Sequence, residues 1–274
     1  MRLVSLASGS NGNCTYVGTD NTHILVDAGC SKKRIEEGLN SLSLSLDDID
    51  AIFLTHEHSD HIASLHTILR RYEIPVYLTN GTKEGVATSF ARNNAAASLL
   101  PRFQEDGTFF DIRAEEDVPV KDILVKPMRI SHDALEPVAY RFFAGGKKVA
   151  VATDMGCFDE TTVQCLQGMD ALLLEANHDL NMLQTGPYPY PLKQRIMGDK
   201  GHLSNEASGA LLNHLLHDHL KGILLGHLSE HNNYPALAYE TVRLAIEMGN
   251  TAYHGNDFPL YVASRSGVSE VITV

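Results

Sequence analysis

The chain contains many short apolar runs that end at a polar or glycine residue, a pattern that predicts a strand-rich fold. The run Ala51-Ile52-Phe53-Leu54, for example, predicts a short buried strand that stops at a polar cluster. Residues 138–144 and 147–153 flank a Gly-Gly pair and predict a hairpin. The other predicted strands cover residues 3–7, 14–17, 23–27, 75–78, 109–113, 118–126, 171–175, 222–226, 251–253 and 260–263.

Helical patterns lie between these runs. Residues 31–45 predict an amphipathic helix, with Ser31 as its N-cap and Ile35 and Leu39 on one face. A second capped helix begins near Ser204 and runs to about residue 219. Further helices are predicted over residues 62–72, 83–92 and 235–248. Because strands alternate with helices, we expect an α/β sheet with helices outside it, and a single domain over residues 1–274.

The composition narrows the function classes. A hydrophobic content of 43% over 274 residues is enough for a large core. The net charge of −12 argues against a protein that wraps nucleic acid on a broad basic face. The four cysteines form no C-x-x-C pair, and the chain shows neither a secretory signal nor an apolar segment of membrane-spanning length. We therefore expect a cytoplasmic protein with reduced thiols and no membrane partner; the oligomeric state stays open.

Four potential metal ligands follow the predicted strand 51–54 within six positions: His56, His58, Asp60 and His61. His56 and His58 lie two apart on extended backbone, so both imidazoles point to one side and can share a cation. Asp60 and His61 stand where the chain turns into the next helix, which directs them to a second point a few ångströms away. Imidazole and carboxylate together suit zinc, manganese or iron. The spacing therefore predicts two adjacent divalent ions.

This His-x-His-x-Asp-His motif resembles the signature of the metallo-β-lactamase superfamily. The resemblance implies a four-layer αββα sandwich, with two mixed sheets flanked by helices, which periodicity alone does not establish. It also implies that His132 completes the site of His56 and His58, and that Asp154 bridges the two ions. In the same way, the resemblance implies that Asp27 lies behind the loop of residues 56–61, the metal loop, and orients one of its ligands.

The second half of the chain resembles the phosphodiesterase branch of that superfamily, typified by ribonuclease Z. By this resemblance Glu175 and His202 form a proton-transfer pair, and His227 completes the site of Asp60 and His61. A hydroxide shared by the two ions would attack phosphorus, and His202, assisted by Glu175, would protonate the leaving oxygen; Asp60 belongs to the same catalytic set. A buried ion pair that joins strand to helix is the structural alternative for Glu175 and His202.

Within this branch the chain resembles small stand-alone bacterial proteins of the YycJ or WalJ type over nearly its full length. The shared runs cover residues 8–14, 174–179 and 201–205. The resemblance implies a DNA exonuclease that acts from the 5′ end, with DNA favoured over RNA. Two alternatives stay open. One is a small-molecule hydrolase acting on a cyclic phosphodiester, thioester or lactone, and the other is a non-catalytic metal- or DNA-binding module.

Two segments are candidates for substrate contact. Residues 8–13 are small and polar, which lets backbone amides approach a ligand, although a plain tight turn fits equally well. Residues 184–200 combine prolines, tyrosines and cations ahead of His202, which suits base stacking and phosphate binding. A polar surface loop stiffened by proline explains the same composition. The candidate substrate-binding residues are Ser10, Asn11, Asn13, Tyr188, Tyr190, Lys193, Arg195 and Lys200.

Overall fold

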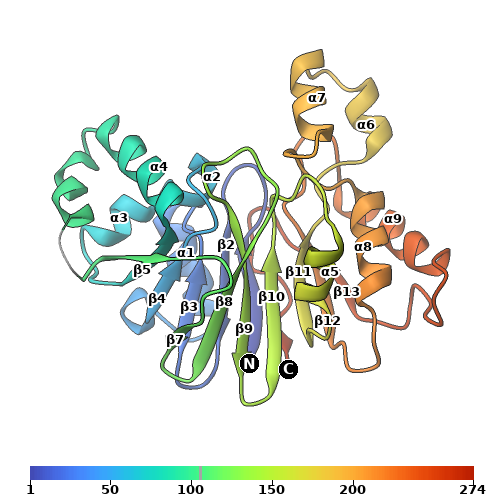
Figure 1. Ribbon diagram of the computed structural model, residues 1–274, viewed down its shortest axis with the longest axis horizontal. Helices are drawn as coiled ribbons and strands as arrows, with labels where there is room; N and C mark the ends of the chain where they lie inside the picture. The colour runs from blue at the N-terminus through green and yellow to red at the C-terminus, as the bar shows by residue number, and fades with distance from the viewer. Residues whose placement is uncertain (105–106) are drawn as a thin grey trace.

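Two seven-stranded β-sheets pack face to face, and helices cover the outer face of each, as Figure 1 shows for the computed structural model, which describes residues 1–104 and 107–274. In each sheet three strand pairs are antiparallel and three are parallel. The predicted architecture, two mixed sheets between helices, is confirmed.

The first sheet has the strand order β14 (Ile272–Thr273), β1 (Arg2–Ala7), β2 (Cys14–Gly18), β3 (His23–Val26), β4 (Ala51–Phe53), β5 (Val76–Thr79) and β6 (Phe109–Ile112). The second has the order β13 (Leu260–Val262), β12 (Gly222–Gly226), β11 (Ala171–Glu175), β10 (Lys147–Ala152), β9 (Val138–Ala144), β8 (Ile123–Arg129) and β7 (Val118–Val120).

The helices divide between the two sheets. The first sheet packs against α1 (Lys32–Ser41), α2 (Ser59–Ile62), α3 (Leu65–Leu69) and α4 (Asn80–Ala91), with 3₁₀ turns η1 (Leu46–Asp48) and η2 (Ala97–Phe103). The second packs against α5 (Glu160–Leu166), α8 (Asn205–Leu215) and α9 (Pro235–Glu247). Two short helices, α6 (Leu180–Thr185) and α7 (Tyr190–Met197), form an arm that projects above the second sheet in Figure 1.

The strands are apolar on both faces because both faces are buried. In β3, Ile24 and Val26 lie between the sheets, whereas Leu25 packs under the helices. In β12 the order is reversed: Leu224 lies between the sheets, and its neighbours Ile223 and Leu225 face the helices. Continuous rather than alternating hydrophobicity is what such doubly covered strands require.

Some of the sequence predictions of secondary structure are wrong. Residues 118–126 form the hairpin β7–β8 instead of one strand, because the polar pair Lys121-Asp122 turns the chain and Lys121 adopts φ 48°. The helix expected over 62–72 is interrupted, since the Ser64 N–H donates to Ala28 O at 2.9 Å outside the helical ladder. Residues 251–253 form no strand; the Tyr253 N–H donates instead to Thr251 Oγ1.

The segment 184–200, expected as a loop, is largely helical. Pro189 is the N-cap of α7, and Pro191 occupies its first turn, where the missing N–H has no helical partner to lose. The helix α5 and the strand β14 were not predicted. Within the described residues no helix is both long and apolar enough to cross a bilayer.

Candidate metal centre

The candidate ligands gather where the strands of both sheets end, at the upper edge in Figure 1. Asp27, Asp154 and His227 follow the strands β3, β10 and β12, and each adopts a left-handed backbone conformation with φ of 63°, 59° and 57°. Non-glycine residues pay about 1–3 kcal/mol for such conformations, which therefore persist where the surroundings enforce them. These are three of the six non-glycine residues with positive φ in the described part of the chain.

The first cluster of donor atoms contains three imidazoles. His58 Nδ1 lies 3.0 Å from His56 Nε2 and 3.2 Å from His132 Nε2. A tetrahedral ion that holds imidazole nitrogens at about 2.0–2.1 Å separates them by roughly 3.3 Å, so these nitrogens already converge on one point. Burial, together with the neighbouring histidines His61 and His132, holds the pKa of His56 well below its ordinary value. His56 is thus neutral, as a ligand must be.

Hydrogen bonds orient two of these rings from behind. His56 Nδ1 lies 3.0 Å from Thr55 Oγ1, and His132 Nδ1 lies 3.0 Å from the carbonyl oxygen of Gly201. Partners on Nδ1 leave Nε2 of each ring directed at the centre.

The second cluster combines a carboxylate with two imidazoles. Asp60 Oδ2 lies 3.5 Å from His61 Nε2 and 3.4 Å from His227 Nε2. On the far side of its ring, His61 Nδ1 contacts Asp27 Oδ2 at 2.8 Å, and Asp27 Oδ1 accepts the Thr55 N–H at 2.8 Å. Asp27 thus contacts the His61 ring from the side opposite Asp60 and also holds the backbone of Thr55.

Asp154 lies between the two clusters. One oxygen is 3.3 Å from His61 Nε2, and the other is 3.8 Å from His132 Nε2. Asp154 is buried, and its Oδ2, the oxygen nearest His61 Nε2, makes no well-aligned hydrogen bond among the described residues. A buried carboxylate oxygen without a donor is costly unless a cation compensates it.

The electrostatics of the protein groups point to the same need. Burial opposes protonation of His227, but Asp154, Asp60 and Glu175 outweigh it and raise the pKa of His227 to about 10. The pKa of His61 is also raised, to well above its ordinary value. Burial alone would lower this pKa, but the carboxylates of Asp154 and Asp27 outweigh burial. Carboxylates at such density, next to nitrogen donors, fit divalent cations.

Glu175 and His202 stand beside the second cluster. Glu175 Oε1 lies 2.8 Å from His202 Nδ1 and 2.9 Å from His227 Nδ1, and Glu175 Oε2 accepts the N–H groups of Met155 and Leu203 at 2.8 and 3.2 Å. Burial favours the neutral acid, but His202 and His227 prevail and hold the pKa of Glu175 below its usual range. One buried carboxylate therefore orients two histidines.

The residues expected to contact substrate are dispersed. Asn13 is 6% exposed, and its Nδ2 lies 3.1 Å from His61 Nε2, so it contacts the metal loop rather than solvent. Ser10 and Asn11 are exposed on the same turn, and Asn11 Nδ2 donates to Glu230.

The remaining candidates lie on or next to α7. Tyr190 is 72% exposed, and Lys200 is exposed beyond the end of the helix. Tyr188 packs edge-on against the ring of His231. The Lys193 ammonium donates to the carbonyls of Gln184 and Gly186. These bonds fix the C-terminal end of α6, so the ammonium is not directed at a ligand.

Arg195 connects the arm to the metal centre. Its Nε pairs with Asp133 Oδ2, while Asp133 Oδ1 lies 3.5 Å from His132 Nε2. Asp133 and Thr55 were not among the site residues predicted from the sequence. Each is directly adjacent to a predicted ligand, His132 or His56, and this position could have indicated them.

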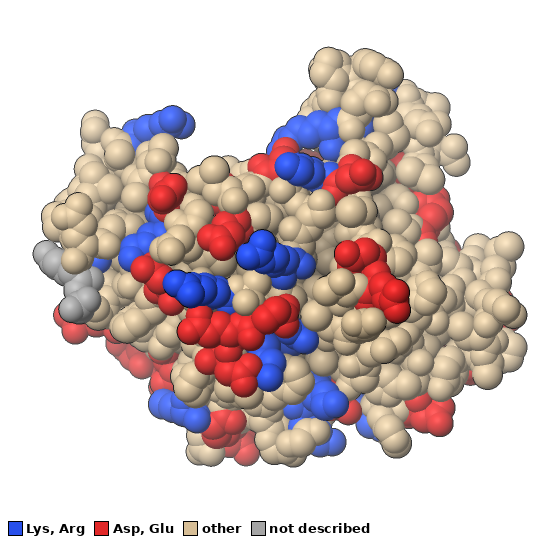
Figure 2. Space-filling view, in the orientation of Figure 1, with Lys and Arg blue, Asp and Glu red and all other residues tan. Residues whose placement is uncertain are grey.

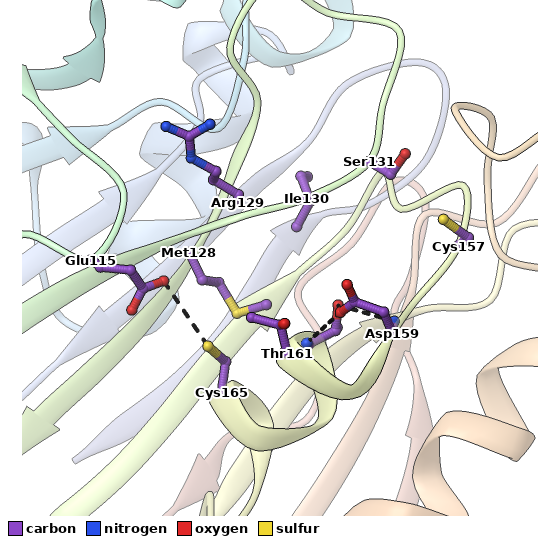
Figure 3. A pocket seen from close by; sticks show the side chains of 10 residues that line it. Glu115, Met128, Arg129, Ile130, Ser131, Cys157, Asp159, Thr161 and Cys165 are labelled. Carbon is purple, nitrogen blue, oxygen red and sulfur yellow. Dashed lines mark hydrogen bonds between the residues drawn. The ribbon is translucent and has the colours of Figure 1, made fainter.

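Figure 2 shows acidic and basic side chains interspersed on this face, with the upper outline notched between α4 and the α6–α7 arm. A pocket of about 680 Å³ adjoins His132 through its neighbour Ser131. In Figure 3 a hydrogen bond from the Cys165 thiol to Glu115 spans one side of this pocket, and Arg129 points away from it.

The fold and the donor set define a metal-dependent hydrolase of the metallo-β-lactamase fold. Residues 22–227 match the family model described as a β-lactamase superfamily domain, and the chain belongs to that family.

Among curated relatives, the chain is 39% identical over 243 residues to exodeoxyribonuclease YycJ of Bacillus anthracis, a match that covers 88% of each protein. It is 36% identical over 261 residues to exodeoxyribonuclease WalJ of Streptococcus pneumoniae, covering 94% of this chain and 93% of that one. Zinc-bound PqqB from Methylobacterium extorquens has the same fold, with a TM-score of 0.71, 19% identity and full coverage of both chains.

Proposed function

We propose that this chain is a dinuclear-metal phosphodiesterase that degrades DNA from an end, with the 5′ end as the point of entry. The observation that carries the proposal is the buried Glu175, which contacts both His202 and the candidate ligand His227. The exodeoxyribonuclease names of the two relatives support the substrate class.

Each cluster would hold one divalent ion. His56, His58 and His132 offer three nitrogens to the first. Asp60, His61 and His227 offer a carboxylate and two nitrogens to the second, and Asp154 can give one oxygen to each. Zinc, manganese and iron all accept such donors. The ions would supply an acidified water at neutral pH and positive charge for the phosphoryl oxygens.

His202 is the proton donor in this proposal. Its side chain is 16% exposed, and Glu175 binds its Nδ1, which stabilises the imidazolium and leaves Nε2 for the substrate. A leaving alkoxide of DNA is a strong base, so a proton delivered at that oxygen lowers the barrier. Asp27 fixes the ring of His61 and takes no part in proton transfer.

The arm supplies contacts to the polynucleotide. Arg195 pairs with Asp133, which places it at the edge of the first cluster. Lys200 is exposed and lies two residues before His202 in the chain. Tyr188 and Tyr190 offer aromatic surface for bases. The ammonium of Lys193 is already bonded to two carbonyls, so the proposal assigns it to the arm itself.

The test is a panel of end-labelled single- and double-stranded DNA and RNA, incubated with manganese or zinc. Successive shortening of duplex DNA from the 5′ end is the expected result. Products cut internally, or a preference for RNA, would contradict it. His202→Ala and Asp154→Asn should each abolish nearly all of this hydrolysis.

A small-molecule phosphodiesterase is the second candidate, and the mixed charges in Figure 2 together with the net charge of −12 favour it. Salt distinguishes the two. DNA held through several phosphates loses affinity steeply between 50 and 200 mM salt, by roughly tenfold or more, whereas turnover of a small diester changes little.

A further inference from the structure

A second pocket, of about 370 Å³, lies beside the backbone that carries His227. The side chain of Ser8 accepts the His227 N–H at 2.7 Å, and Leu228 follows His227 in the chain. The pocket lies past the ends of the parallel strands β12 and β13, where α/β proteins commonly bind ligands. Its wall includes Ser8, Leu228, Tyr234, Val262, Ser264 and Arg265.

An aromatic ring forms one wall of this pocket. Tyr234 is 51% exposed and stands at the N-cap of α9, where its side chain makes no capping bond. Val262 and Ala263 give the pocket an apolar patch. Ser8 and Ser264 line the same pocket; their hydroxyl oxygens accept backbone N–H groups, and each hydroxyl keeps its own hydrogen to donate. A planar ring with polar edges matches this combination, since its face can stack on tyrosine while its edge meets hydroxyls.

A cation lies at the same place. Arg265 Nη2 donates to Leu228 O at 3.2 Å, and its side chain packs against Gly9. Arg265 Nη1 is buried without a hydrogen-bond partner among the described residues, and the carboxylate of Glu230 lies 3.6 Å away. Arg34 donates to Arg265 O at 3.3 Å, which fixes this part of the chain. Because the Arg265 side chain is still 30% exposed, the guanidinium is a fixed positive charge at the pocket that phosphate or sugar oxygens can approach.

We propose that this pocket binds the base of the nucleotide next to the scissile phosphate, stacked on Tyr234, with Arg265 against the sugar–phosphate backbone. The inference rests on the proposed phosphodiesterase function and adds a base-binding subsite to it. Leu228 in its wall follows His227 in the chain, and Ser8 accepts the His227 N–H, so a base in this pocket would lie beside the backbone that carries a candidate ligand. The pocket beside Ser131 is less suited, because its described lining has no aromatic residue.

The test compares two chromogenic substrates with the same leaving group. Thymidine 5′-(p-nitrophenyl phosphate) carries a base, and bis(p-nitrophenyl) phosphate does not. For Tyr234→Ala, the ratio of kcat/KM for the nucleotide over the reference substrate should fall by about 5- to 100-fold, the range for one base stacked on one aromatic ring. Tyr234→Phe should restore the ratio. Phe110→Ala, which removes a 39% exposed aromatic ring on β6 of the other sheet, is the matched control and should leave the ratio unchanged.

An unchanged ratio would overturn the subsite. If both substrates lose activity equally, Tyr234 only stabilises the start of α9; if neither loses activity, Tyr234 does not contact the base. If the wild-type chain hydrolyses neither substrate, the proposed function fails, and binding of deoxyadenosine monophosphate to the metal-loaded chain then decides the subsite. Saturation-transfer NMR should detect this binding in the wild type and show it weakened in Tyr234→Ala. No binding, or equal binding, would overturn the subsite.

Discussion

Replacing Glu175 by Gln tests the proposed chemistry most directly, because this side chain contacts both halves of the site. Its Oε2 accepts two backbone N–H groups, so the glutamine oxygen is expected to stay there. The amide nitrogen then takes the place of Oε1, between His202 Nδ1 and His227 Nδ1. An N–H donor at that place requires both Nδ1 atoms to become acceptors, which moves the ring protons to Nε2.

The two histidines should respond in different ways. Protonated Nε2 on His227 can no longer serve as a ligand beside Asp60, so the second cluster should lose about 10–100-fold in metal affinity. His202 loses the carboxylate that stabilises its imidazolium, so proton donation should weaken and kcat on DNA should fall by about 10²–10⁴-fold. Each lost charge-assisted bond also costs about 1.5–3 kcal/mol of folding free energy.

Three measurements separate these effects. Metal content after dialysis against graded chelator reports the ligand defect, and kcat at saturating metal reports the proton-donor defect. At saturating metal the loss on DNA, whose leaving alkoxide needs a proton, should exceed the loss on bis(p-nitrophenyl) phosphate. Glu240→Gln on the surface of α9 is the control. Equal losses on the two substrates would refute proton donation by His202 and support a purely structural ion pair.

Three further predictions address the loop and its charges. Asp27→Asn keeps a residue that tolerates the left-handed conformation but releases the imidazole behind the metal loop, so mass spectrometry should find metal retention lowered by about 10–100-fold at one of two sites; full retention at both would be inconsistent with the assigned role. Gly29→Ala places a Cβ 1.6 Å from Asp60 O, so it should lower the free energy of unfolding by about 1–3 kcal/mol and reduce metal binding. Gly145→Ala, which has open space around its Cβ, is the control and should keep the metal. Normal metal binding by Gly29→Ala would show that the loop tolerates displacement. In chelated protein the pKa of His227 is about 10, above its ordinary 6.5, so the protonated form contributes stability that is present below about pH 6.5 and is lost as the pH rises towards 10; thermal melts in chelator should show a falling Tm over this window, and a flat profile would contradict the charge arrangement.

The local part of the site could be predicted because it depends on spacing within one strand exit. His56 and His58, two residues apart, converge in the structure as extended backbone requires. The more distant partners, such as His132 and Asp154, came from resemblance and chain order, since no local pattern relates positions separated by 70 or more residues. Their side chains nevertheless lie 3.2 and 3.3 Å from His58 and His61, respectively.

What sequence could not predict depends on tertiary contacts. The prolines of the arm suggested a loop, but Pro189 and Pro191 lie at positions that a helix start accepts. Lys193 looked free for phosphate until the fold brought two carbonyls to it. Asn13 looked like a surface contact, yet the turn places it against the metal loop. The second partner of Glu175 likewise required the register between β11 and β12.

The donor atoms come from both sheets: the loop after β4 belongs to the first, whereas His132, Asp154 and His227 extend from the second. Ions bound here would add a link between two halves whose shared layer is mainly apolar and which already exchange a few polar contacts, such as the Tyr140 hydroxyl donating to Leu54 O at 2.6 Å. Removing the ions with a chelator should therefore weaken the contact between the two sheets before either sheet unfolds by itself. In hydrogen-exchange experiments, amides of the strands that face the shared apolar layer should then lose protection first, and amides of the outer helices later.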